Sequence, residues 1–355
     1  MKIMITGGHV TPALAVLDEI KNQEIVFVGR QYALSNEKTE SFEYKEITAR
    51  KVRFINLVAG RLNRSLSLDA LAGLALIPHG FFRARQIVAA EKPDVVLSFG
   101  SYLAVPIAYW ANKFKIPVYT HEQTIQPGIA NRTISRWAKK VFISFPQSAE
   151  FFPKEKVLQT GNPIRKSILR VADIPFHIPK KKPVIYITGG SLGSHSINQH
   201  VEAIIDELKR DYFVIHQTGD TKTYNDYERL ARYADESYML RKHVNAQELA
   251  FILQEADLVI SRCGANTIFE LLAVRKPAIF IPLPWSGHDE QRRQAALLKD
   301  AHVAMVFEQS RPSIELLDCV RQMTEDLKKY SNFSKLRTLI AEDAAHRIYE
   351  EILKS

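Results

Sequence analysis

The chain has 355 residues, of which 46% are hydrophobic, enough for two α/β domains with globular cores. Its formal net charge of +9 suits a partner that carries phosphate, whether nucleic acid, anionic lipid or nucleotide. Two cysteines are too few for a disulfide framework, and neither a signal peptide nor a run of about 18 apolar residues is visible, which indicates a cytoplasmic protein that could rest on a membrane.

Short apolar runs alternate with longer helical patterns along most of the chain, which predicts parallel sheets with crossover helices. The expected strands are residues 2–6, 24–28, 95–98, 118–121 and 140–144 in the first half, and 184–188, 213–217, 257–261 and 278–282 in the second. The proline- and lysine-rich stretch 174–183 keeps neither periodicity and is predicted to be a linker. The last expected helix, 332–353, is amphipathic and could pack on either half.

This alternation predicts an α/β fold of two Rossmann-like, doubly wound domains, residues 1–163 and 164–355, separated by a cleft. In open parallel sheets of this kind, ligands bind outside the carboxyl ends of the strands. The turns after the expected strands are therefore the candidate functional segments.

The first such turn reads Thr6-Gly7-Gly8-His9. Paired glycines let the backbone approach a ligand closely, and His9 could donate a hydrogen bond to a phosphate or an acceptor oxygen. The alternative is an ordinary tight turn whose histidine is merely solvated.

A second cluster, His121-Glu122-Gln123, ends an apolar strand in the first half. Polar side chains in this position are costly to bury unless they are hydrogen-bonded or functional. Glu122 or His121 could position or deprotonate an acceptor hydroxyl. The alternative is a structural hydrogen-bond cluster that supports the following loop.

Two turns in the second half have the character of anion sites. Residues 189–193 are Gly-Gly-Ser-Leu-Gly; they lack the spacing of a dinucleotide fingerprint, but their N–H groups and Ser191 could hold a diphosphate. Gly264-Ala265-Asn266 forms an expected turn before a helix whose free N–H groups suit an anion. Glu270, one turn into that helix, could grip a vicinal diol such as ribose, although any α/β protein has strands, glycine turns and helices.

Between residues 57 and 88, apolar residues alternate with arginines. An apolar stripe flanked by arginines fits a membrane-surface patch, although on the residues alone such a stripe is more often core with a solvated rim. Lysine pairs elsewhere lack the basic and aromatic interleaving of a nucleic-acid groove, so we expect no nucleic-acid partner. The residues of the stripe are Leu68, Leu71, Leu74, Leu76, Ile77, Phe81 and Phe82, with Arg61, Arg64, Arg83 and Arg85.

Taken together, seven segments resemble the bacterial MurG family of peptidoglycan N-acetylglucosaminyltransferases, in family order and over nearly the whole chain. The resemblance implies a GT-B fold and inverting transfer of N-acetylglucosamine from UDP-GlcNAc to the muramoyl C4 hydroxyl of lipid I, which forms lipid II. It also implies a peripheral protein on the cytoplasmic face of the plasma membrane, with the 57–88 stripe against anionic lipid. The segments are 6–13, 98–102, 121–128, 160–165, 189–193, 216–219 and 261–294.

The resemblance also implies roles for individual residues. Arg165 and Ser191 would hold the donor diphosphate, and Gln291 would hold the sugar hydroxyls. The nucleoside and its phosphates would bind to the segment from Ala265 through Asn266 and Thr267 to Glu270, with Glu270 on the ribose. Uracil would lie near residues 244–246. Thr6, Gly7, Gly8 and His9 would face the lipid-linked acceptor diphosphate and the donor sugar.

Two positions depart from the family pattern. The first turn has only Thr6-Gly7-Gly8 before His9, where the family has a longer glycine run, so it offers fewer N–H groups to a diphosphate. Thr124 stands where the family has asparagine, which keeps a hydroxyl but loses the paired donor and acceptor of the amide. Both departures concern acceptor handling more than donor binding.

The expected mechanism uses His9 or Glu122 as the base that helps the acceptor hydroxyl attack the anomeric carbon as UDP departs. No Asp-x-Asp motif occurs, so we expect no metal ion and no cofactor, and the leaving-group charge would be met by helix N-termini, Arg165 and Ser191. Three alternatives stay open. They are a transferase for another lipid such as diacylglycerol, a donor-binding module that has lost catalysis, and a UDP-sugar epimerase.

Overall fold

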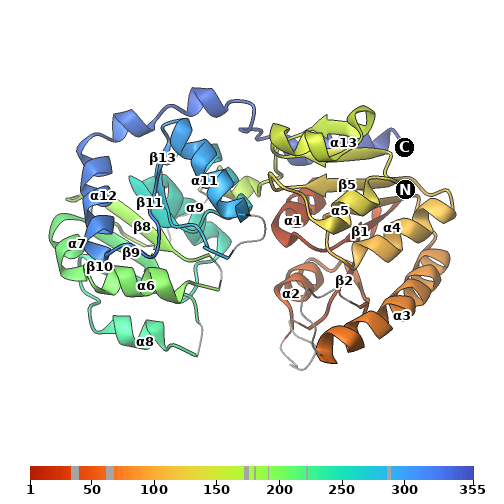
Figure 1. Cartoon of the computed structure of the whole chain (residues 1–355), viewed down its shortest axis with the longest axis horizontal. Coiled ribbons are helices and arrows are strands. Elements are labelled where there is room, and N and C mark those ends of the chain that lie inside the picture. The colour runs from red at the N-terminus through yellow and green to blue at the C-terminus, as the bar shows by residue number, and fades with distance from the viewer. Residues whose placement is uncertain are drawn as a thin grey trace. The chain divides into compact units, whose positions relative to one another are not determined.

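Two parallel β-sheets organise the chain, one in each of two units, in a computed structural model of the whole sequence (Figure 1). The first unit is Met1–Ile164 with Ala341–Ser355, and the second is Arg165–Ile340. The structure describes residues 1–32, 40–60, 68–171, 176–179, 181–190, 192–220, 223–285 and 289–355, with the side chains of 68–75 left out. Within these residues, no helix is both long and apolar enough to cross a membrane.

The first unit contains a seven-stranded sheet in the order β3-β2-β1-β4-β5-β6-β7, in which all neighbours are parallel. The chain moves outward in both directions from β1 and β4, so the topological switch point lies between these two strands. Thr6 pairs with Ser98 at their carboxyl ends. The strands are β1 (Lys2–Thr6), β2 (Glu24–Gly29), β3 (Arg53–Asn56), β4 (Val95–Ser98), β5 (Val118–Glu122), β6 (Lys140–Ile143) and β7 (Val157–Gln159).

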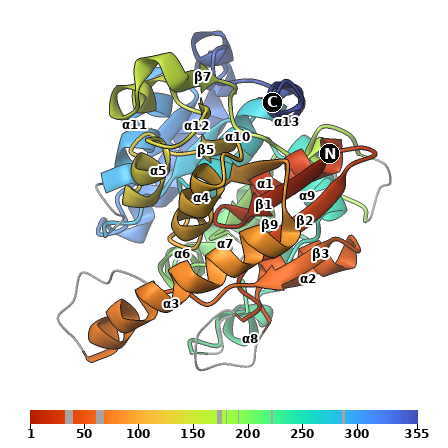
Figure 2. The same ribbon diagram turned by 90° about the vertical axis from the view of Figure 1, so that its right-hand side faces the viewer.

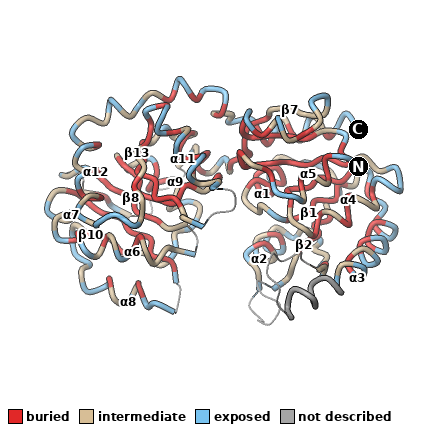
Figure 3. Tube along the Cα trace, viewed as in Figure 1, coloured by how far each residue is buried: buried red, intermediate tan, exposed pale blue. Residues whose placement is uncertain are grey.

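Helices cover both faces of this sheet because alternate strand residues point to opposite sides. Ile3 and Ile5 join one buried cluster, and Met4 between them joins the other. Figure 3 shows the buried residues concentrated along the strands of each unit. The helices of the first unit are α1 (Val10–Glu19), α2 (Phe42–Ala49), α3 (Leu68–Glu91), α4 (Ala104–Lys113), α5 (Ile129–Ile134) and α13 (Ala344–Leu353).

The C-terminal segment belongs to the first unit, one of the two positions that the sequence left open for the last helix. Helix α13 packs against α1 and buries Ile348 and Ile352 in the core of the first unit. The expected helix 332–353 is also wrong in its first half. Phe333–Leu336 is a 3-10 turn that buries Phe333 and Leu336, a spacing of three residues that suits a 3-10 rather than an α-helix.

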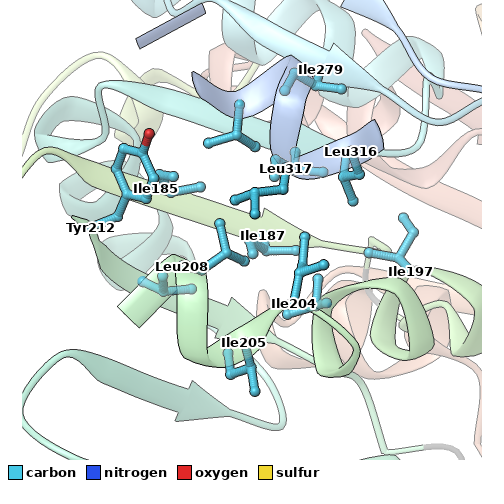
Figure 4. Packing of buried hydrophobic residues seen from close by; sticks show 14 of the residues in the cluster. Ile185, Ile187, Ile197, Ile204, Ile205, Leu208, Tyr212, Ile279, Leu316 and Leu317 are labelled. Carbon is cyan, nitrogen blue, oxygen red and sulfur yellow. The ribbon is translucent and has the colours of Figure 1, made fainter. Parts of the chain in front are cut away.

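The second unit repeats the same architecture with a six-stranded parallel sheet in the order β10-β9-β8-β11-β12-β13, so its switch point lies between β8 and β11. Ile185 and Ile187 of β8 pack against Leu208 and against Leu316 and Leu317 (Figure 4). The strands are β8 (Val184–Thr188), β9 (Phe213–Gln217), β10 (Tyr238–Arg241), β11 (Leu258–Ser261), β12 (Ala278–Phe280) and β13 (Ala304–Val306). The helices are α6 (His195–Glu202), α7 (Ile205–Asp211), α8 (Asp226–Ala231), α9 (Ala246–Glu255), α10 (Ala265–Val274), α11 (Glu290–Asp300) and α12 (Ser313–Glu325).

All nine expected strands are confirmed, and the strands that the sequence analysis missed are β3, β7, β10 and β13. Each of these four is the outermost strand of its sheet. The expected linker is wrong, because Phe176 packs edge to face on Phe251 at 5.3 Å and Ile178 is buried in the second unit. The chain instead passes between the units at Ile164 and Arg165.

Candidate functional site: polar clusters at the two switch points

The turn after β1 lies at the switch point of the first sheet, beside the end of β4. The N–H of Gly7 donates to the Val28 carbonyl at 3.0 Å, and the N–H of His9 donates to the Phe99 carbonyl at 3.1 Å. A Cβ on Gly8 would lie 2.7 Å from the same Phe99 oxygen, so this approach requires glycine. Thr6 is fully buried, and its Oγ1 has no hydrogen-bond partner among the described residues. Two of the turn's N–H groups are therefore engaged within the protein.

His9 stands immediately before α1 and is half-buried. Its Nδ1 is buried without a hydrogen-bond partner in the described chain. Burial lowers the pKa of His9, although the charge of Glu122 opposes this shift. The imidazole is therefore neutral at pH 7 and able to accept a proton.

Glu122, at the end of β5, is 1% exposed, and both of its carboxylate oxygens are occupied. Oε1 accepts hydrogen bonds from the N–H of Thr124 at 2.9 Å and from its hydroxyl at 2.7 Å, and Oε2 accepts from Asn131 Nδ2 at 2.9 Å. Thr124 thus uses its hydroxyl within the protein. The arrangement matches the structural cluster considered from the sequence, with its charge close enough to act on His9.

His121 belongs to the same buried cluster but has a different environment. It is fully buried, and burial lowers its pKa to about 3, so it stays neutral. Its Nε2 lies 3.1 Å from the Ser144 hydroxyl and 3.4 Å from the Gly161 carbonyl. These contacts tie β5 to the ends of β6 and β7, which favours a structural role.

In the second unit, the loop after β8 is anchored to the loop after β9. Gly193 has a φ of +78°, and a Cβ there would overlap the Thr218 carbonyl, so glycine is required. The N–H of Gly190 donates to Thr188 Oγ1 at 3.0 Å. Ser191, expected to hold the diphosphate, lies outside the described residues.

Helix α10 begins at the other side of this switch point, after β11. Gly264 precedes it with no side-chain cap, so the first-turn N–H groups, those of Ala265, Asn266 and Thr267, have no capping partner from that residue. Asn266 also has a buried Oδ1 without a hydrogen-bond partner among the described residues. The helix start is present where the sequence predicted it, and anion binding there stays a prediction.

Two residues assigned to the donor by resemblance lie together. Arg165 Nη2 is 3.6 Å from Glu270 Oε1, and Glu270 is 9% exposed. Burial raises the pKa of Glu270, and the guanidinium of Arg165 opposes that shift. Gln291 is on α11, where its Oε1 accepts from the N–H of Leu283 at 3.0 Å, in the turn that follows β12.

Two charged residues at these strand ends were passed over in the sequence analysis. Arg262 follows β11 directly and is 8% exposed, a position that could have been noticed by the argument used for Glu122. Glu43, on α2, is buried against Gly7 and Gly29, and burial raises its pKa to about 7. No local sequence signal marks Glu43. In the described residues, no group of three or more His, Cys, Asp or Glu is placed to hold a metal ion.

Comparison with known proteins gives the family. The model of the N-terminal domain of glycosyltransferase family 28 matches residues 6–143, and that of the C-terminal domain matches residues 184–348. The chain belongs to glycosyltransferase family 28. Both domains of family 28 are therefore present in one chain; the N-terminal match lies within the first unit, and the C-terminal match lies in the second apart from residues 341–348.

Full-length relatives carry one name, UDP-N-acetylglucosamine–N-acetylmuramyl-(pentapeptide) pyrophosphoryl-undecaprenol N-acetylglucosamine transferase. The protein from Shouchella clausii is 32% identical over 341 residues, which cover 93% of this chain and 92% of the relative. That from Acetivibrio thermocellus is 32% identical over 372 residues, covering 99% and 97%. The resemblance to the MurG family is confirmed.

Solved structures share the fold of this family 28 chain. The MurG crystal structure from Acinetobacter baumannii has a TM-score of 0.71 at 24% identity and covers 100% of this chain and 99% of its own. A UDP-GlcNAc 2-epimerase from Neisseria meningitidis has a TM-score of 0.67 at 15% identity and covers 100% of both chains. The expected GT-B fold, built from two Rossmann-like domains, is confirmed.

Proposed function

We propose that this chain transfers N-acetylglucosamine from UDP-GlcNAc to the C4 hydroxyl of the muramoyl sugar of lipid I, with inversion, and so forms lipid II for peptidoglycan synthesis. The observation that carries the proposal is the match over nearly the full length to relatives with this named activity. The position of the sequence motifs at the switch points of both sheets supports it, because ligands bind there in Rossmann-like domains.

The donor belongs on the second unit. Glu270 accepts hydrogen bonds from the ribose hydroxyls, and Arg165 turns from Glu270 to the diphosphate when UDP-GlcNAc enters. The uncapped start of α10 supplies N–H groups and a positive helix end for the same phosphates, together with Ser191. Gln291 holds the sugar hydroxyls. These donors stabilise the negative charge that develops on UDP as it leaves.

The acceptor hydroxyl is activated on the first unit, and His9 suits this role better than Glu122. The imidazole is neutral and has a nitrogen without a partner, whereas both carboxylate oxygens of Glu122 are occupied. His9 takes the hydroxyl proton while the new bond to the anomeric carbon forms and the bond to the UDP oxygen breaks. Glu122 stabilises the imidazolium that results.

The first unit also contacts the membrane, through the aromatic surface of α3 and α4, which pack side by side (Figure 2). Phe82 is 56% exposed and Phe114 is 40% exposed. Arg85 lies over the ring of Trp110 at 5.4 Å, so a cation and an amphipathic ring are presented together. This combination suits anionic headgroups on the cytoplasmic face.

The stripe predicted over residues 57–88 is only partly surface. Ile77 and Phe81 are half-buried, and the ring of Phe81 packs against that of Tyr109 at 5.5 Å, as in the core alternative. Leu76, Phe82, Arg83 and Arg85 are exposed, as a patch requires. Arg61 and Arg64 lie outside the described residues, as do the side chains of Leu68, Leu71 and Leu74.

The function is tested by supplying UDP-GlcNAc with lipid I, with diacylglycerol, or with no acceptor, and separating the products. We expect transfer to lipid I alone. Transfer to diacylglycerol instead would assign another lipid acceptor, and UDP-ManNAc formed without acceptor would make the protein an epimerase. UDP-GlcNAc binding without turnover on authentic lipid I would leave only a donor-binding module.

A further inference from the structure

Arg262 carries a buried positive charge at the switch point of the second sheet. It is 8% exposed, and burial lowers its pKa to about 10. Among the described residues it has no ion pair, whereas Arg229 of the same unit contacts Glu202 at 2.7 Å and Asp226 at 2.6 Å. Burying a cation without a counter-ion is costly, and such a charge is retained where an anion balances it.

The partners of Arg262 are all neutral oxygens. Nη2 donates to the hydroxyls of Ser194 at 2.8 Å and Ser196 at 2.6 Å, and Nη1 donates to the Ile281 carbonyl at 2.9 Å and the Pro282 carbonyl at 3.4 Å. Nε has no partner within the described chain. The guanidinium therefore joins the loop after β8, the end of β11 and the end of β12 without being neutralised.

These contacts also change how α6 begins. Ser194 precedes α6, where a serine hydroxyl usually accepts a hydrogen bond from the first-turn N–H groups. Here the Ser194 side chain makes no cap, and its oxygen accepts from Arg262 instead. The first-turn N–H groups of α6 therefore have no cap from Ser194, and they lie at the same carboxyl edge of the sheet as the start of α10, which also has no side-chain cap.

We propose that Arg262 is a positioning residue for the donor diphosphate. Its charge is not paired with a carboxylate among the described residues, and it attracts the diphosphate. Its hydrogen bonds to Ser194 and Ser196 leave the start of α6 open to the phosphates. This inference rests on the proposed function, because it needs a nucleoside diphosphate on the second unit. Arg262 does not donate hydrogen bonds to the phosphates itself, because both of its Nη atoms are already engaged. It acts through its charge and through the start of α6.

The test compares UDP with uridine in calorimetric titrations of the full chain, because only UDP carries the diphosphate. Arg262→Gln keeps hydrogen-bond donors but loses the charge, and Arg262→Lys keeps the charge. We expect the Gln variant to bind UDP about tenfold more weakly or worse, the Lys variant to recover most of that loss, and uridine binding to be unchanged in both. Arg232→Met, an exposed change of the same charge in the same unit, should leave both affinities unchanged.

Each result decides a different point. Wild-type UDP affinity in a folded Arg262→Gln, or equal losses for UDP and uridine, would overturn the role in diphosphate binding. If the Gln variant does not fold, the Lys variant decides, because a purely structural guanidinium predicts that UDP and uridine weaken together there. A wild-type chain that binds uridine and UDP equally, or neither, would overturn the donor site itself and with it the proposed function.

Discussion

Replacing Glu43 with glutamine tests whether a buried carboxyl beside the first glycine turn changes charge near neutral pH. Its Oε2 accepts from the N–H of Arg30 at 3.1 Å, and its Oε1 is buried without a partner among the described residues. A Cβ on Gly7 or on Gly29 would overlap the carboxyl group, so both glycines make room for it. Burial raises the pKa of Glu43 from 4.5 to about 7, and the backbone N–H of Arg30 and the charge of its side chain oppose this shift.

The direction of the pH dependence follows from the form of Glu43 that the folded state disfavours, which is the ionised carboxylate. Because the folded pKa of Glu43 is raised, its contribution to stability is fully present below pH 4.5 and is lost as the pH rises through about 7. The shift corresponds to about 3 kcal/mol, and most of it falls between pH 5 and pH 8. Glutamine cannot ionise. Any cost of its unpaired amide is the same at every pH, so the free-energy difference between the two proteins should change by about 2 to 3 kcal/mol over that range.

The assay is urea unfolding of the first unit at pH 5, 6, 7 and 8. Trp110 and Trp137 lie in this unit, and Trp285 lies in the second, so a Trp285→Phe background makes tryptophan fluorescence report on the first. Glu46→Gln removes a partly exposed carboxylate from the same helix and keeps Glu43, so it should retain the wild-type pH dependence. Parallel pH profiles for wild type and Glu43→Gln would refute the reasoning.

Three further outcomes are expected. Glu270→Ala should weaken UDP binding by about 1 to 3 kcal/mol in calorimetry, and unchanged affinity in a folded variant would remove Glu270 from the donor site. Phe82→Ser should reduce sedimentation with anionic vesicles but keep UDP affinity; undiminished sedimentation would mean that α3 faces elsewhere. His9→Gln should lower kcat on lipid I by about 10² to 10⁴ with UDP affinity kept. Wild-type activity should fall only at pH values below the ordinary histidine range, because burial lowers the pKa of His9. A wild-type decline that begins above pH 6.5 would contradict that assignment.

The interior of both sheets was predictable from sequence, and their edges were not. Strand β4, Val95–Ser98, is buried on both faces and reads as a continuous apolar run. Edge strand β3, Arg53–Asn56, has charged and polar ends and only partly buried centres, so no run and no clear alternation mark it. An edge strand is defined by the neighbour it pairs with, which is information that a local window does not contain.

The same limit divides the candidate site. The glycine turns and the start of α10 are local, because a few consecutive residues produce them, and sequence located them. Glu43 is buried against Gly7 and Gly29, which are distant in sequence. Arg262 likewise donates to the hydroxyls of Ser196 and Ser194, which are 66 and 68 residues away. The choice between His9 and Glu122 likewise depended on which of them already had hydrogen-bond partners.

The two switch points differ in charge, and the difference matches the proposed chemistry. The switch point of the first unit has Glu43, Glu122 and a neutral His9, which suits the removal of a proton. The switch point of the second unit has Arg165, Arg262 and helix starts without side-chain caps, which suit a departing diphosphate. The shortened glycine turn fits this division. Its engaged N–H groups hold His9 in place, and α1 begins without a side-chain cap, so the start of this helix suits the acceptor phosphates of the proposed function. In the proposed mechanism, a shorter turn offers fewer N–H groups to phosphate and still places His9 near the charge of Glu122.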